Sequence, residues 1–159
     1  MNGAHLHLIL THGPVLGLVF GTILLGYAWW RGGEEVRRLA LVFTAVAGLL
    51  ALPAYFTGED AEDIVEGLPA VSKSVIHEHE EAAEGAAIAA VVTAVLAIGG
   101  FALALRQGAT PRWAVAGVAV AGTVASVWLG VTAYRGGSIR HPEMDQAAPA
   151  PVAQRHDRD

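Results

Sequence analysis

The feature that most constrains this chain is a set of four long apolar runs without a single charged residue. They cover residues 8–30, 39–56, 85–105 and 113–134, and none contains Lys, Arg, Asp or Glu. A helix needs about 20 apolar residues to cross the roughly 30 Å hydrocarbon core of a bilayer. The helices of a soluble bundle would each keep a polar face, which these runs lack. The sequence therefore predicts an all-α membrane protein, a four-transmembrane-helix bundle with helices at about residues 5–30, 35–56, 74–105 and 111–134.

Local signals set the expected ends of these helices within one domain, residues 1–143. Pro53 should bend or end the second helix, because proline cannot donate a backbone hydrogen bond. Thr110-Pro111 is a typical start for the fourth helix, with the threonine as its cap. The glycine pairs Gly32-Gly33 and Gly136-Gly137 should end the first and fourth helices. Residues 57–73 read as a loop, and residues 144–159, rich in Ala, Pro and charge, as a disordered tail.

The basic residues predict how the bundle is oriented. Three arginines lie in the short segment 31–38 and two in the segment 106–112. Short loops rich in Arg and Lys stay on the cytoplasmic side. Both termini and the acidic segment 57–73 then lie on the outer, periplasmic side of a bacterial inner (cytoplasmic) membrane. No basic residue precedes the first run, which exceeds a signal-peptide core, so we expect it to be retained.

Composition narrows the function classes. The 159 residues include no cysteine, which excludes disulfides, thiolate metal ligands and iron–sulfur clusters. The net charge of −5 makes nucleic acid a poor partner. The chain carries no nucleophile elbow, phosphate loop or zincin motif, so nothing predicts a hydrolase or transferase. Whether it is an enzyme stays open.

Six of the seven histidines converge on the outer surface in this topology. Three open the first run, two open the third helix, and one follows the fourth: His5, His7, His12, His77, His79 and His141. Imidazole is the commonest protein ligand for haem iron and for late transition metals. This end of the bundle is the candidate site, although His5 and His7 also suit plain interfacial positions.

Depth and helical phase favour His12 and His79 as a pair of haem ligands. His12 lies deepest in the apolar run, where an unpaired polar ring is costly. His79 shares its helix face with small residues that would leave space for a flat haem: Ala83, Ala86 and Ala90. The expected site is a bis-imidazole b-type haem between the first and third helices. Arg135 and Arg140 are expected to pair with the haem propionates.

A divalent transition metal is the rival occupant of this end. His77 shares a helix face with Glu81 and Glu84, and mixed imidazole–carboxylate sets suit zinc or copper. The remaining candidate ligands for such an ion are His5, His7, His12, His79 and His141. A third alternative is a cofactor-free accessory subunit of a larger membrane complex.

Several short motifs resemble a group of small four-helix bacterial membrane proteins of uncharacterised function. They are Thr11-His12-Gly13-Pro14, Thr57-Gly58, the early histidine of the third helix, and the segment 134–142 with its Gly-Gly pair. The likeness covers most of residues 1–143 and implies a four-helix fold and a cytochrome-like, haem-binding role. By this resemblance His12 and His79 match the paired histidines. Gly13 departs from the group, which tends to have a bulky apolar residue there, and His5, His7 and His77 are not clearly shared.

These observations predict a membrane-embedded b-type cytochrome-like electron-transfer protein, with haem b near the outer face. Its partners would be the lipid bilayer, the quinone pool and a periplasmic or membrane redox protein. The sequence leaves open whether the chain forms a homo-oligomer or joins a larger complex.

Overall fold

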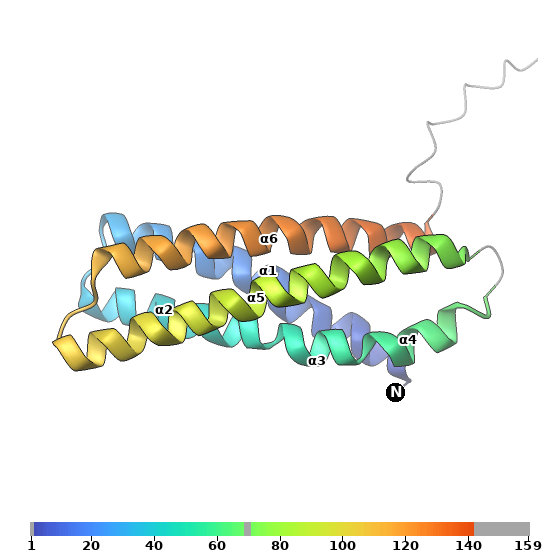
Figure 1. The fold of residues 1–159 in the computed structure, drawn as a ribbon, viewed down its shortest axis with the longest axis horizontal. Helices are drawn as coiled ribbons and strands as arrows, with labels where there is room; N and C mark the ends of the chain where they lie inside the picture. Colours follow the sequence, from blue (N-terminus) through green and yellow to red (C-terminus); the bar gives the residue numbers. More distant parts are fainter. Residues whose placement is uncertain (1, 69–70, 142–159) are drawn as a thin grey trace, which may run out of the picture.

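The computed structural model describes residues 2–68 and 71–141, and every regular element within them is a helix (Figure 1). In chain order these are α1 (Gly3–Trp30), α2 (Glu34–Leu49), α3 (Ala51–Phe56), α4 (Gly58–Val65), α5 (Lys73–Gln107) and α6 (Arg112–Arg140). Four helical stretches are long and apolar enough to cross a membrane: Gly3–Trp30, Glu34–Val65, Lys73–Gln107 and Arg112–Arg140. The predicted set of four spans is confirmed, and it fits a multi-pass membrane protein. The predicted tail lies outside the described residues.

The four spans pack as a closed bundle in which each long helix has two main neighbours. α5 packs against α6 and α2, and α1 packs against α6 and α2. Small side chains fill the interior, among them Ala86, Ala90 and Ala97, while large ones such as Phe20, Ile23 and Trp113 are exposed. Membrane helices associate through small residues because lipid surrounds their large apolar side chains. The packing therefore matches a bundle whose outer surface faces hydrocarbon.

The second span is interrupted at Leu50, as Pro53 predicts. α2 stops at Leu49, and α3 resumes at Ala51 with Pro53 in its first turn. Proline has no N–H to offer the carbonyl of Leu49, four residues earlier, so the ladder of hydrogen bonds is broken there. The resulting short α3 presents Ala51 and Ala54 to the interior.

Two expectations about irregular segments are wrong. Part of the acidic stretch read as a loop is helix α4, which begins with Glu59 and Asp60 in its first turn. Acidic side chains at a helix N-terminus are stabilised by the helix dipole. α4 also packs against the start of α1, where Asp60 touches Gly3.

The glycine pair at 136–137 does not end the last helix, because α6 runs through it to Arg140. A glycine costs a helix only about 1 kcal/mol, so tertiary contacts can hold it in helical conformation. Here Gly136 lies against the ring of His79 on α5. The start of this helix also differs: Pro111 is its cap, and the Thr110 hydroxyl donates to the Glu34 carboxylate instead.

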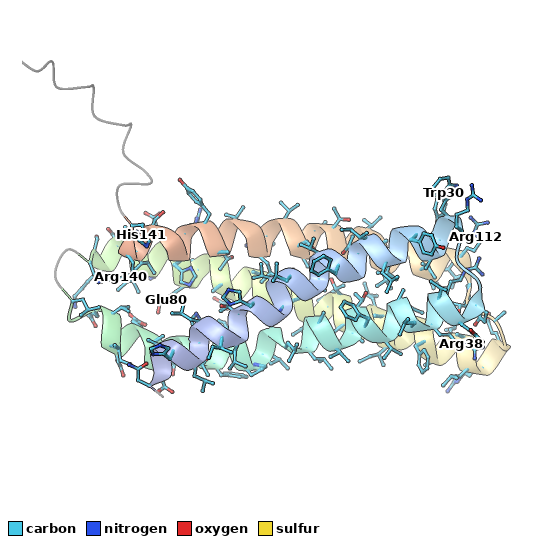
Figure 2. The ribbon with its side chains drawn as sticks, turned by 180° about the vertical axis from the view of Figure 1, so that it is seen from behind. Trp30, Arg38, Glu80, Arg112, Arg140 and His141 are labelled. Atoms are coloured by element: carbon cyan, nitrogen blue, oxygen red, sulfur yellow. The ribbon has the colours of Figure 1, made fainter. Side chains whose placement is uncertain are left out.

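The chain begins at the end of the bundle where α4 lies, α5 starts and α6 finishes (Figure 1). The opposite end holds the turns from α1 to α2 and from α5 to α6, with Trp30, Arg38 and Arg112 (Figure 2). The two ends therefore differ in chemistry, one histidine-rich and acidic, the other rich in arginine and tryptophan.

Candidate functional site

A hollow opens in the histidine-rich half of the bundle, between residues of four helices. Two of its lining residues are histidines, and most of the others are small or apolar: His7, Thr11, Pro14 and Val15 of α1, Ala51, Ala54 and Tyr55 of α3, His79, Ala83 and Ala87 of α5, and Leu129 of α6. The hollow encloses about 60 Å³, and with its open mouth the space is about 400 Å³. It brings together imidazoles from two spans that are 72 residues apart in sequence (79 − 7).

His7 is anchored to the second span. Its Nδ1 lies 2.9 Å from the carbonyl oxygen of Ala54, and a carbonyl can only accept, so Nδ1 donates the hydrogen. The Thr57 hydroxyl lies 3.1 Å from the same oxygen and 3.4 Å from Nδ1. A neutral imidazole that donates from Nδ1 has an unprotonated Nε2. His7 therefore has a lone pair at Nε2 beside the hollow.

His79 is anchored in the same way to the fourth span. Its Nδ1 donates to the carbonyl oxygen of Thr132 at 3.0 Å. The ring is half-buried, with Gly136 packed against it. One and two turns further along α5, Ala82 and Ala86 are buried, so His79 stands at the end of an alanine face. His79 thus also keeps Nε2 free of a proton.

His12 does not face His79 in this arrangement. It is exposed on α1, and its Nδ1 donates to the Leu8 carbonyl of its own helix at 2.6 Å. That bond satisfies the polar ring without a partner from another helix, which removes the cost expected of an unpaired imidazole at this depth. His12 is absent from the lining of the hollow. His7, one and a half turns nearer the N-terminus, takes the inward position.

The face proposed for a metal ion remains on the surface. The imidazole of His77 lies 3.7 Å from the Glu80 carboxylate and 3.5 Å from that of Glu81, and all three side chains are exposed. Glu84, His5 and His141 are exposed as well. Within residues 2–68 and 71–141, no three or more His, Asp or Glu side chains are grouped so that they could hold a metal ion. The expected set of His77, Glu81 and Glu84 is therefore not assembled.

Two arginines of α6 lie on the same half of the bundle as the hollow. Arg135 donates from Nη1 to the carbonyl of Glu78 at 3.0 Å, which places its guanidinium beside the turn that carries His79. Arg140 is exposed at the end of α6, next to His141 in the chain. Both arginines lie at this end of the bundle, but neither lines the hollow.

A seven-residue repeat in α1 could have shown that His7 faces inward. The buried positions Pro14, Gly21 and Ala28 recur every seven residues, and His7 is one step before them. Such a repeat marks the seam of packed helices. The repeat is difficult to recognise in the sequence, because the run is apolar on every face and only its small residues mark the buried positions.

No protein-family model, curated protein or solved structure matches the chain.

Proposed function

We propose that this protein is a membrane-embedded b-type haem protein that transfers electrons, with His7 and His79 as the two axial ligands. One observation carries the proposal. Each imidazole donates from Nδ1 to a backbone carbonyl of a neighbouring span, which leaves Nε2 free at a shared hollow. Ligating histidines almost always have their other ring nitrogen anchored in this manner, because the bond fixes the tautomer and the ring orientation.

The residues around the hollow fit a haem in chemistry. Two neutral imidazoles would hold the iron, and four of the eleven lining residues are alanines with small side chains: Ala51, Ala54, Ala83 and Ala87. Sites for small molecules measure roughly 300–1,000 Å³. The cavity volume of about 60 Å³ is below that range, and the larger value of about 400 Å³ also counts open solvent. A porphyrin would therefore extend beyond the hollow as it stands.

The chain's own residues would position this group and set its surroundings. Ala54 and Thr132 hold the ligand rings through their carbonyls, while Arg135 and Arg140 can pair with the propionates, which are anionic. When bound, a haem supplies a one-electron couple. A site near one membrane surface suits exchange with a quinone in the bilayer and with a redox protein outside it.

For the orientation, we propose that the histidine-rich end faces the outside of a bacterial inner membrane. The support is the charge distribution. Arg31, Arg37, Arg38, Arg106 and Arg112 all lie in or next to the turns at the opposite end, and short loops rich in arginine stay in the cytoplasm. Arg31 and Arg112 also lie over the rings of Trp30 and Trp29, at 5.0 Å and 5.3 Å from the ring centroids.

A bound transition-metal ion is the second candidate occupant, because the enclosed 60 Å³ suits an ion with ordered water. Zinc or copper would take the same two Nε2 atoms and complete its coordination with water. The experiment for the haem proposal separates the two occupants.

The test is an absorption spectrum of the full chain, purified after expression with added haem precursor, oxidised and then reduced with dithionite. We expect a Soret band and a sharp α-band typical of six-coordinate b-type haem. His7→Ala and His79→Ala should each lose the six-coordinate spectrum. His12→Ala and His77→Ala are the matched controls and should keep it, since neither ring lines the hollow.

A colourless protein in every preparation would refute the haem proposal. Stoichiometric zinc or copper that disappears in His7→Ala and His79→Ala would instead support the metal alternative. Loss of the haem spectrum in His12→Ala, with His7→Ala unaffected, would return the ligand role to His12.

A further inference from the structure

The last three turns of α6 contribute two residues, spaced four apart on one face, to the contact with the ring of His79. Thr132 offers its carbonyl to Nδ1, and Gly136 offers a surface without a side chain. Residues four apart in a helix lie one above the other on the same face. The ring is therefore held by the hydrogen bond from its Nδ1 to Thr132 and by close packing against Gly136.

Gly136 is the tighter of the two contacts. A methyl group at this position would lie 3.0 Å from Cε1 of His79, 3.3 Å from Nδ1 and 3.6 Å from Nε2. These distances run along the edge of the ring that carries both nitrogens. An alanine here would push the ring away from α6 and crowd the approach to Nε2. The His79 ring can therefore hold this position only because residue 136 has no side chain.

Thr132 is tied to α5 a second time through its side chain. Its hydroxyl lies 3.0 Å from the carbonyl oxygen of Ala82 and 3.1 Å from that of Trp128 in its own helix. The hydroxyl is buried, so it needs an acceptor within the protein. The bond to Ala82 fixes α6 against α5 within one turn of His79, and so fixes the carbonyl that the imidazole uses.

We infer that Thr132 and Gly136 form a seat for the His79 imidazole, and that both are positioning residues for the ligand site. The seat holds Nδ1 as the donor, which leaves Nε2 without a proton and available for a ligand bond. It gives the Gly-Gly segment a role other than ending the helix. The inference rests on the proposed function for its purpose, but the seat itself is testable without haem.

The experiment uses full-length protein in detergent, labelled with ¹⁵N-histidine and free of haem. His79→Gln identifies the His79 signals. In the wild type we expect a proton on Nδ1, none on Nε2, and slow exchange of the Nδ1 proton with solvent. Gly136→Ala should shift both ring signals and speed that exchange. Thr132→Val, which keeps the backbone carbonyl, should give a smaller change in the same direction, and Thr132→Ser should restore the wild-type signals.

Gly130→Ala is the matched control, because Gly130 also lies in α6 and a methyl group there would meet nothing within 4 Å. Its His79 signals should match the wild type. In haem titrations Gly136→Ala should bind about 10- to 100-fold more weakly than Gly130→Ala, which is the usual effect of disturbing a ligand's hydrogen-bonded support.

The ¹⁵N signals of His79 test the seat, and the haem titration tests the proposed function, so either can fail without the other. Identical His79 signals in Gly136→Ala and Gly130→Ala, or an Nε2-protonated ring in the wild type, would overturn the seat. The expected signals in a protein that binds no haem would support the seat and refute the haem proposal.

Discussion

At the scale of single residues, the hydrogen-bond partner of each histidine ring distinguishes the candidate ligands better than the depth of that ring in the apolar run. His12 is deeper in the apolar run than His7, but it bonds to a carbonyl of its own helix and is exposed. His7 and His79 each reach a carbonyl on a different span. An anchor on another helix holds the ring at an interface between helices, which is where a cofactor can be enclosed.

At the opposite end of the bundle, one carboxylate accepts hydrogen bonds from two neighbouring turns, which makes a prediction about stability. Glu34 accepts from the backbone N–H of Thr110 at 2.8 Å, from the Thr110 hydroxyl at 2.7 Å and from Arg38 Nε at 2.7 Å. Arg38 also donates to the carbonyl of Gly108 at 3.2 Å. These contacts tie the start of α2 to the turn between α5 and α6.

Glu34→Ala should therefore lower the midpoint of thermal unfolding in detergent, because it leaves the Thr110 donors and Arg38 without their shared acceptor. The neighbouring Glu35→Ala is the control and should change the midpoint little, since Glu35 is exposed. Equal midpoints for the two variants would show that the contact does not stabilise the fold.

At the scale of helices, close approach of backbones is what lets the spans pack with mostly small interior side chains. Gly48 on α2 is an example, since a methyl group there would lie 2.6 Å from the carbonyl oxygen of Ala90 and 2.9 Å from Cβ of Ala94. Because the first of these atoms is backbone, α2 and α5 would have to separate to make room.

Gly48→Ala should accordingly destabilise the bundle by about 1–3 kcal/mol, the usual cost of overpacking. Gly99→Ala on α5 is the control, because a methyl group there meets nothing within 4 Å. Reversible unfolding in mixed micelles measures both. A Gly48 variant as stable as the Gly99 variant would contradict the close packing of α2 on α5.

At the scale of the whole molecule, the contrast between the two ends predicts the topology. The chain has no cysteine, so one introduced thiol reports its own position without background. Ser74 at the start of α5 and Gln107 at its end are both exposed. They lie at opposite ends of the longest helix, so they would lie on opposite sides of a membrane that the helix crosses.

In intact bacterial cells, Ser74→Cys should react with a membrane-impermeant maleimide, whereas Gln107→Cys should react only after the cells are permeabilised. The physical reason is retention of the arginine-rich turns on the cytoplasmic side. The reverse labelling pattern would place the histidine-rich hollow in the cytoplasm and change the redox partners available to it.

Much of the architecture could be predicted from the sequence, because the ability of a segment to cross a bilayer depends on the length and apolarity of that segment alone. Length and apolarity are properties of a segment, and they identified all four spans and the break near Pro53. Helix α4 and the continuation of α6 past Gly136 were missed, because packing against other helices decides both. Gly136 remains helical in contact with a ring 57 residues earlier in the chain (136 − 79).

The candidate site also combines features that the sequence predicts with features that only the packing of the helices decides. The sequence by itself determined that histidines gather at one end, that His79 lies on an alanine face, and that no thiolate takes part. Only the tertiary structure decided that His7, and not His12, shares the hollow with His79. The physical reason is that α1 is apolar on every face, so only the spacing of its small residues indicates which side meets the bundle. That side is chosen by contacts of Gly17 with Ala47 and of Gly21 with Thr44, small residues on two helices that fit only in one register.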